Sequence, residues 1–279
     1  MGNEHYARYY HALRAIEIRF PVSSDSSHVN VSFKWHDAFV DSQTCTQKNI
    51  HFEKAGVLFC MAALESQKGA EANRDTRDGI AEAVKAFSLA AGAPRLCCNY
   101  EALACHVPHA ALVSSSQQVA AVTAVTTQQR AARSAGIFRY MREEVVLKTD
   151  SPRSTDISGE CCAMLEELML AQAQEMFYEM LSAKRAADGA GSAIKRATLA
   201  AAAWSVSELY EAAHEAYLKP QLVRHVQREW GESSKTKALL YKAQAHFMQA
   251  RPPPLHTQDA QRTPLYWRHC WPMQHGNTG

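Results

Sequence analysis

The feature that most constrains the fold is an uninterrupted apolar stretch at residues 164–178, MLEELMLAQAQEMFY. Neither glycine nor proline interrupts it, and its side chains repeat at steps of three and four residues, as on one face of an α-helix. The residues on this face are Leu165, Leu168, Met169, Gln172, Met176 and Phe177. The small side chains of Ala171 and Ala173 would let a neighbouring helix approach closely. The stretch therefore predicts the central helix of an all-helical packing unit.

Gln172 and Gln174 are unusual residues so near an apolar face. A buried amide needs hydrogen-bond partners. If both side chains are buried, we expect them to fix how the neighbouring helices sit.

Further segments show the helical period. Residues 6–19 place Tyr9, Leu13 and Ile16 on one side. We expect the other helices at about 49–68, 76–91, 191–217, 220–229 and 233–250. Asp75 or Thr76 could cap one of them, and Asp156 or Ser158 the central helix. Proline 220 suits a first helical turn.

Residues 28–35, HVNVSFKW, alternate between apolar and polar side chains, which is the period of a strand with one buried face. The apolar members are Val29, Val31, Phe33 and Trp35. Because one strand cannot stand alone, we expect a short hairpin or an extended arm laid across helices. The predicted fold class is all-α in the main, with a short β-strand or hairpin near the N-terminus.

Charge and composition narrow the function classes. Lysine and arginine total 30 against 28 for aspartate and glutamate, so the net charge of +2 gives no global reason to expect nucleic acid as a partner. No signal peptide or long apolar run is visible. The eight cysteines have no compact disulfide spacing, which favours reduced thiols in the cytoplasm.

Two segments depart from the helical pattern. Residues 93–135 have no sustained helical face and separate 78–92 from 137–145, which would otherwise continue one helix. We expect this segment to be a disordered insertion, either a long loop or translated non-coding sequence. Residues 251–279 carry prolines that cannot extend a helix, and they predict an irregular tail.

A cluster of metal-ligand residue types lies within 93–135. Its members are Cys97, Cys98, Cys105, His106 and His109. Their spacing fits no standard zinc finger, so we expect no metal site. Cys161 and Cys162 have no histidine close in sequence to act as a base, which favours inert thiols. Because HExxH, GxSxG, P-loop and GxGxxG patterns are all absent, we expect a non-enzymatic chain without a cofactor.

Several blocks follow one another along the chain: WHDAF at 35–39, HFEKAGVLFCMAALESQKGAE at 51–71, DGIAEAVKAFSLAAG at 78–92 joined to IFRYMREEV at 137–145, and DISGECCAMLEELMLAQAQEMFYE at 156–179. These blocks resemble the Bro-one domain family. Their order and spacing agree with the family, and LMLAQAQE is highly characteristic of it. The resemblance implies a curved helical domain with tetratricopeptide-like helix hairpins. On this view residues 1–250 are a partial domain, interrupted by 93–135 and lacking the family's opening segment and final long helices.

The resemblance also implies a binding site. In ALIX-like members an outward-facing apolar patch binds the C-terminal amphipathic helix of an ESCRT-III subunit. Here that patch would include Phe177, with Ile194 and Leu199 on the next helix, where a one-residue gap leaves the register open. Core packing is the alternative for all three residues, and it is the favoured one for Ile194 and Leu199.

One charge of the ALIX-like patch is missing, because its flanking basic residue aligns with Met180. Lys184, Lys195 or Arg196 could take its place. In such a site the apolar anchors give affinity and the rim charges give orientation. The basic stretch 184–196 also suggests a weak contact with anionic endosomal membrane, although a solvated helix end is the more ordinary interpretation.

The resemblance implies a non-enzymatic adaptor that is cytoplasmic, is recruited to endosomes and acts in multivesicular-body formation. Three alternatives stay open. One is a signalling scaffold of the rhophilin kind that binds other partners. The second is a truncated gene product without function, and the third is a zinc or thiol enzyme that uses the cysteine and histidine cluster.

Overall fold

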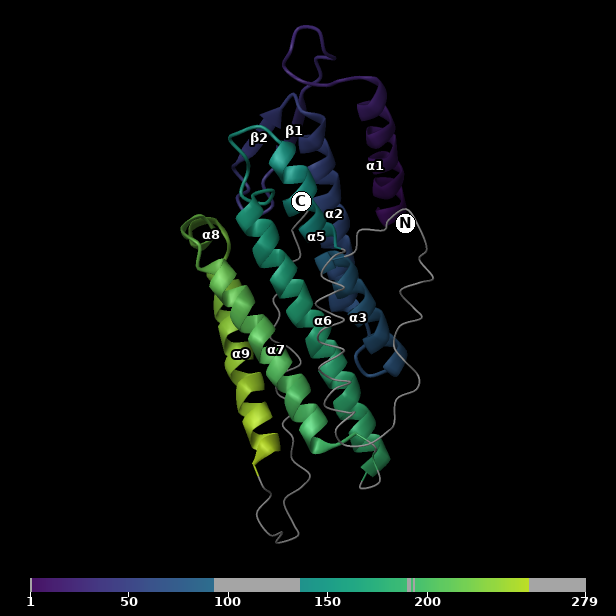
Figure 1. The fold of residues 1–279 in the computed structure, drawn as a ribbon, viewed down its shortest axis with the longest axis vertical. Helices are drawn as coiled ribbons and strands as arrows, with labels where there is room; N and C mark the ends of the chain where they lie inside the picture. The colour runs from purple at the N-terminus through teal and green to yellow at the C-terminus, as the bar shows by residue number, and fades with distance from the viewer. Residues whose placement is uncertain (1, 93–135, 190–191, 193, 251–279) are drawn as a thin grey trace, which may run out of the picture. The chain divides into compact units, whose positions relative to one another are not determined.

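The computed structural model describes residues 2–92, 136–189, 192 and 194–250 (Figure 1). The chain divides into two compact units, Met1–Gln249 and Ala250–Gly279, and nearly all described residues belong to the first. The segment 93–135, its cysteine and histidine cluster and the tail 251–279 lie outside the described residues. In the described part the fold is mainly helical with one short two-stranded sheet, which confirms the predicted class.

The elements follow one another along the chain. They are α1 (Gly2–Arg19), β1 (Phe33–His36), β2 (Thr44–Gln47), α2 (Ile50–Glu71), α3 (Arg77–Gly92), α5 (Ile137–Tyr140), the π-helical turn η1 (Met141–Val145), the 3-10 turn η2 (Val146–Lys148), α6 (Gly159–Asp188), α7 (Arg196–Tyr217), α8 (Pro220–His225) and α9 (Arg228–Gln249). Three predicted boundaries are wrong in the later part of this series. The helix expected at 191–217 begins only at Arg196, and the helix from Pro220 is shorter than expected. The last helix begins five residues earlier than residue 233.

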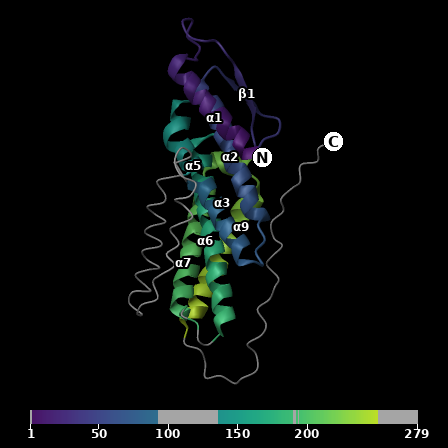
Figure 2. The same ribbon diagram turned by 90° about the vertical axis from the view of Figure 1, so that its right-hand side faces the viewer.

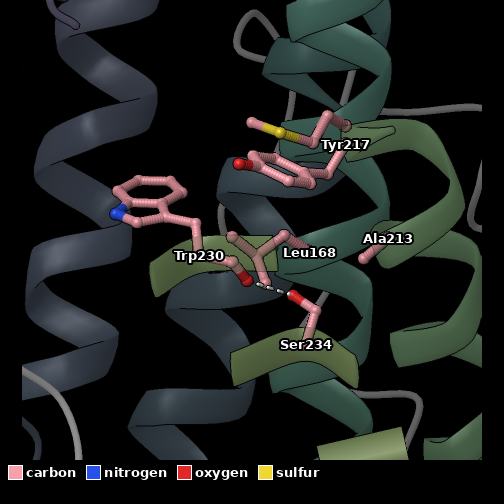
Figure 3. A pocket seen from close by; sticks show the side chains of 6 residues that line it. Leu168, Ala213, Tyr217, Trp230 and Ser234 are labelled. Atoms are coloured by element: carbon pink, nitrogen blue, oxygen red, sulfur yellow. Dashed lines mark hydrogen bonds between the residues drawn. The ribbon is translucent and has the colours of Figure 1, made fainter. Parts of the chain in front are cut away.

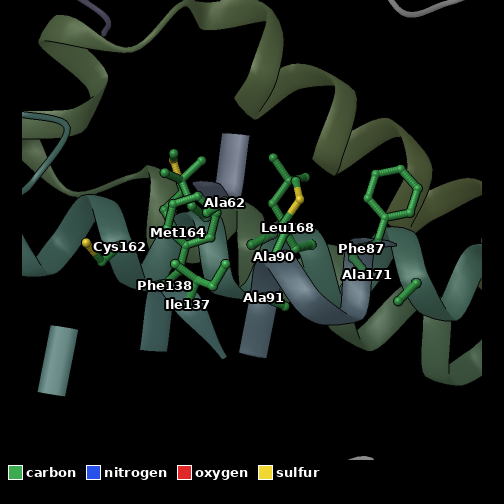
Figure 4. Close-up of a cluster of buried hydrophobic side chains, with 14 of the residues drawn as sticks. Ala62, Phe87, Ala90, Ala91, Ile137, Phe138, Cys162, Met164, Leu168 and Ala171 are labelled. Atoms are coloured by element: carbon green, nitrogen blue, oxygen red, sulfur yellow. The ribbon is translucent and has the colours of Figure 1, made fainter. Parts of the chain in front are cut away.

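The long helices pack in a simple order, α1 on α2, α2 on α3, α3 on α6, α6 on α7 and α7 on α9 (Figures 1 and 2). Small side chains make this close packing possible. Figure 4 shows Ala90, Ala91 and Ala171 beside Phe87 and Leu168 in the core where α3 meets α6. Because alanine adds little width, the helices approach closely and each large side chain is covered on several sides.

Helix α6 is the central helix that the apolar stretch predicted, and side chains on most of its circumference are buried. Ser158 is its N-cap, because its hydroxyl accepts a hydrogen bond from the Cys161 amide at 3.1 Å. The helix ends at Gly189, whose φ of 63° lies in the left-handed region that favours glycine. Helix α6 is 30 residues long and packs against both α3 and α7.

The expectation that the buried amides of Gln172 and Gln174 find hydrogen-bond partners is wrong for their carbonyl oxygens. Both side chains are buried, but within the described residues neither Oε1 atom has a hydrogen-bond partner. The helices on either side of α6 bury mainly alanine and other apolar side chains, which supply no donors. Apolar contact with α3 and α7 therefore does more than these two oxygens to fix the neighbouring helices.

The buried face of α1 is rotated by about one residue from the predicted one. Tyr10 and Leu13 are buried, whereas Tyr9 and Ile16 are exposed. Both tyrosines have polar partners: the Tyr10 hydroxyl donates to that of Tyr140 at 3.1 Å, and the Tyr9 hydroxyl donates to the Glu53 carboxylate at 2.7 Å. Because both neighbouring positions hold tyrosine, apolar periodicity alone could not select the correct face.

The predicted strand is real but shorter, and it forms the expected hairpin. β1 pairs antiparallel with β2, with Phe33 opposite Gln47 and His36 opposite Thr44. Val29 and Val31, which were assigned to the buried face, lie before β1 and are exposed. The alternating sequence pattern therefore starts at residue 28, whereas strand pairing starts only at Phe33.

Two carboxylates attach the hairpin to the segment before α6. Asp37 accepts hydrogen bonds from the Phe39 amide at 2.8 Å and the Thr155 amide at 2.5 Å. Asp156 accepts in return from the Ala38 amide at 3.1 Å. These bonds join two of the sequence blocks, WHDAF and DIS, and explain why Ser158 rather than Asp156 caps α6.

Candidate partner-binding surface

Residues of α6 help to line two of the hollows in the described part of the chain. The first, of about 10 Å³, lies among Met164, Leu168, Ala213, Tyr217, Trp230 and Ser234 (Figure 3). That volume holds about one water molecule. The second is an open groove of about 310 Å³, lined by Arg142, Leu147, Gly159, Glu160, Ala163, Ala216 and Lys219. Arg142 is already paired there with Glu166 at 2.9 Å, and neither lining joins a nucleophile to a base.

The surface side of α6 carries a row of partly buried apolar residues. Leu170, Phe177 and Leu181 follow at steps of seven and four residues, so they lie on one face of the helix. All three are half-buried, whereas Met176 and Tyr178, next to Phe177, are buried in the core. Phe177 therefore has an aromatic ring that the core does not fully cover. The row is a suitable apolar floor for a partner.

Other residues that the family resemblance assigns to the patch lie on or close to the connection from α6 to α7. Arg185 of α6 donates a hydrogen bond to the Ile194 carbonyl, which fixes the chain just before α7. Ile194 and Met180 are half-buried and pack against the core. Leu199, in contrast, is only 5% exposed and belongs to the core. The structure thus offers Phe177, Met180 and Ile194 to solvent in part, whereas Leu199 lies within the core.

The basic residues near this surface differ in their availability. Lys184 and Lys195 are exposed, and Lys195 occupies the N-cap position of α7. Arg196 instead donates to the Phe247 carbonyl of α9 at 2.8 Å, and its guanidinium lies 5.4 Å from the centre of the Phe247 ring. Lys195 is therefore more available than Arg196 to take the place of the basic residue that aligns with Met180.

A buried polar cluster lies on the inward side of the same part of α6. The Glu175 carboxylate accepts hydrogen bonds from Lys237 Nζ at 2.7 Å and from the Tyr241 hydroxyl at 2.9 Å. The Tyr210 hydroxyl donates to it as well. The four residues come from α6, α7 and α9, so the cluster ties three helices together behind the row that contains Phe177.

These contacts determine the charge state of the cluster. Burial opposes ionisation of Glu175, but the Lys237 ammonium and the donated hydrogen bonds outweigh it and hold the pKa of that carboxyl below its ordinary value. Burial, reinforced by the Glu175 charge, raises the pKa of Tyr210 well above its ordinary value. At neutral pH the cluster is an ion pair with two neutral phenols.

The cysteines of α6 do not suit nucleophilic chemistry. Cys161 and Cys162 are fully buried, and burial raises the pKa of the Cys162 thiol to about 12. The Cys161 pKa is also raised well above its ordinary value by burial. A thiolate is therefore disfavoured at both positions despite the nearby helix N-terminus. Over the described ranges, no group of three or more potential metal-ligating side chains comes together.

Sequence reasoning missed the buried cluster and the contact between Arg196 and Phe247. A signal existed for the first: Glu175 lies within an apolar run, and a buried carboxylate needs a partner. Its partner Lys237 is 62 residues away and has no local signature. No described helix is both long and apolar enough to span a bilayer.

Comparisons with known proteins agree with this fold and these blocks. The vacuolar-sorting protein BRO1 of Arabidopsis thaliana is 35% identical over 242 residues, covering 86% of this chain and 22% of that protein. Rhophilin-2 of Mus musculus is 27% identical over 249 residues, covering 89% of this chain and 28% of that protein. The chain thus spans about a quarter of the length of these relatives.

Solved structures and a family model extend the comparison. An ALIX BRO1 CHMP4C complex matches with a TM-score of 0.63 at 24% identity, covering 88% of this chain and 55% of that one. This likeness establishes the fold. The model of the BRO1-like domain matches residues 1–99 and 95–262. The chain therefore belongs to the BRO1-like domain family.

Proposed function

We propose that this chain is a non-enzymatic adaptor whose α6 surface binds the C-terminal amphipathic helix of an ESCRT-III subunit during endosomal sorting. The observation that carries the proposal is the half-buried row of Leu170, Phe177 and Leu181 on a helix that is otherwise mostly buried. A row of this length suits the apolar face of one helix. The matched complex of ALIX BRO1 with CHMP4C and the vacuolar-sorting name of the Arabidopsis relative support this choice of partner.

Exposed lysines near the row make the charge contacts with the partner helix in this proposal. Lys195 and Lys184 are exposed and meet acidic side chains of the incoming helix. Leu199 makes no direct contact, because its side chain lies in the core. The adaptor acts in the cytoplasm and is recruited to endosomes, with the basic stretch 184–196 in weak contact with anionic membrane.

A titration tests the proposal. A labelled peptide of the CHMP4C C-terminal helix is added to the purified chain and followed by fluorescence anisotropy, with circular dichroism to verify folding. Phe177→Asp should abolish saturable binding because it places a charge on the apolar floor. Ile18→Asp is the matched control, because Ile18 is an exposed apolar residue on α1.

Two results would contradict the proposal. One is the absence of peptide binding by the folded wild-type chain. The other is binding that survives Phe177→Asp unchanged. Either result would favour a scaffold of the rhophilin kind, which the 27% identity to Rhophilin-2 and the apolar Met180 in place of a basic residue also suit.

A further inference from the structure

Helix α7 carries a second row of partly buried residues, next to the row on α6. Its members follow at steps of three and four residues, so they share one face of the helix, and all of them are half-buried. They are Ala201, Ser205, Leu209, Ala212 and Ala216. Four of the five side chains are apolar, and three of them are alanine. The α7 row is therefore low and mostly apolar.

The two rows run side by side in opposite directions, because α6 and α7 are antiparallel neighbours (Figure 1). Ala163 of α6 and Ala216 of α7 both line the second hollow. Seven residues onward from Ala163 stands Leu170, and seven residues back from Ala216 stands Leu209. These two leucines are thus at the same level, and the next step of seven along α6 reaches Phe177.

Helix α9 covers the opposite side of this helix pair. There Lys237 of α9 meets Glu175 of α6 at 2.7 Å, and Trp230 and Ser234 of α9 line the first hollow. The rows lie on the side of α6 and α7 away from these contacts. We name the surface formed by the two rows and the second hollow the α6–α7 face; its α6 members are Ala163, Leu170, Phe177 and Leu181.

The second hollow closes one end of the α6–α7 face. Its volume of about 310 Å³ is far larger than that of the first hollow and is enough for a bulky side chain. Gly159, Ala163 and Ala216 give it a low apolar floor, and Leu147 of η2 stands at its rim with 70% of its surface exposed.

The charges at the second hollow balance one another. Arg142 is paired with Glu166, and the exposed Glu160 and Lys219 carry opposite signs. A charged side chain entering the hollow would gain little from this lining, whereas an apolar one would cover the floor and Leu147. The hollow therefore suits an apolar side chain.

We propose that the second hollow is a second anchor site for the same partner helix, at the far end of the α6–α7 face from Lys184 and Lys195. This inference rests on the proposed function. The partner helix lies along both rows, places one apolar side chain over Phe177 and places another in the hollow beside Leu147. Fourteen residues separate Ala163 from Phe177, which is about 21 Å along the helix axis. The partner segment is therefore at least four turns long.

Continuity along the same two helices favours this occupant. The rows join the hollow to Phe177 without a change of helix, so one straight helix reaches both. A separate small molecule would need several converging polar groups to orient it. The lining offers few: Arg142 already has its partner, and Glu160 and Lys219 lie exposed.

The test uses three labelled peptides of the CHMP4C C-terminal helix. One has about 20 residues, or roughly 30 Å of helix, and the other two lack about seven residues, two turns, at one end or the other. Anisotropy titrations with the full chain compare their affinities. The peptide that lacks the end over the second hollow should bind about tenfold more weakly than the long one.

Variants of the hollow locate the missing contact. Leu147→Ser should weaken binding of the long peptide several-fold, and Ala163→Trp, which fills the hollow, should weaken it about tenfold. Neither change should weaken the peptide that lacks the hollow end, because that contact is already absent. Leu218→Ser is the matched control, since Leu218 is 55% exposed near the end of α7 and does not line the hollow. Circular dichroism verifies folding.

The outcomes separate this inference from the proposed function. If the folded wild-type chain binds none of the peptides, the proposed function fails and the second anchor fails with it. If all three peptides bind equally, or if Leu147→Ser and Ala163→Trp leave the long peptide unaffected, only the second anchor is overturned. An equal loss in Leu218→Ser would overturn it too. So would self-association of the peptide-free chain that Leu147→Ser removes, because the face would then belong to a second copy.

Discussion

The Lys237 ammonium of α9 lies 2.7 Å from the buried Glu175 carboxylate of α6. This pair is shielded from most solvent, and two tyrosine hydroxyls complete the hydrogen bonding of the carboxylate. Truncating one partner leaves the other charge buried without compensation, which costs more than the intact pair contributes. The junction of α6, α7 and α9 therefore depends on all four side chains.

Lys237→Met should destabilise the fold by about 3 kcal/mol, because Glu175 would remain buried without its cation. Urea unfolding followed by circular dichroism measures the loss. Lys235→Met is the matched control, because Lys235 is an exposed lysine on the same helix and should change stability by less than about 0.5 kcal/mol. Equal effects of the two changes would show that the buried pair has no special role.

Acid should weaken the fold through Glu175. Its pKa is lower in the folded chain than in the unfolded one, so the unfolded state takes up its proton first as pH falls. The stabilisation is complete above the unfolded pKa of about 4.3 and is lost as pH falls through the lower folded pKa. Stability measured from pH 6 downward should therefore decline more steeply in the wild type than in Glu175→Gln. Parallel curves would contradict this assignment.

Gly56→Ala should destabilise the chain by about 1–3 kcal/mol. A Cβ atom there would overlap the Trp35 ring, which cannot easily move because its Nε1 donates to Glu53 at 2.8 Å. Gly159→Ala is the matched control, since no atom lies within 4 Å of a Cβ added at that position. Thermal melts of both variants compare the two sites. A melting temperature for Gly56→Ala equal to that of the wild type would show that the hairpin is free to shift.

Leu199 and Lys195 should respond differently to substitution. Leu199→Ala should cost about 3 kcal/mol, because it leaves a cavity in the core. Lys195→Glu should leave stability nearly unchanged and weaken binding of the CHMP4C peptide, because it reverses an exposed rim charge. Denaturation and anisotropy separate these effects. A stable Leu199→Ala variant that had lost peptide binding would show that Leu199 contacts the peptide directly.

The thiols of α6 should be protected in the native state. Cys161 and Cys162 are buried with raised pKa values, whereas Cys45 is partly exposed. A small alkylating reagent at pH 8 should modify Cys45 well before the other two, as mass spectrometry of digested protein would show. Adding denaturant should remove the difference. Rapid native modification of Cys162 would indicate that α6 opens.

The sequence was most informative where a signal was local. The long apolar period of α6 predicted its existence, and a cap at Ser158 was among the two candidates named. The face of α1 was misassigned because adjacent tyrosines both suit a helix interface. The partner of Glu175 could not be found, because contacts between distant helices depend on packing that no local pattern specifies.

The candidate surface shows the same limit. Apolar spacing and the family resemblance identify Phe177, but periodicity does not distinguish a half-buried ring from a core one. The division between Ile194, which is half-buried, and Leu199, which is in the core, depends on how the connection after Gly189 enters α7. That path is fixed by the Arg185 contact with the Ile194 carbonyl, which no spacing rule anticipates.

The bonds between Asp37 and Thr155 and between Asp156 and Ala38 have a consequence for synthesis on the ribosome. Each joins residues 118 positions apart in the chain. At an elongation rate of about 5–20 residues per second, the hairpin is made roughly 6–24 s before its anchor leaves the ribosome. During that interval Asp37 lacks the Thr155 amide from which it accepts in the folded chain, so the hairpin reaches its anchored position only when the segment before α6 emerges.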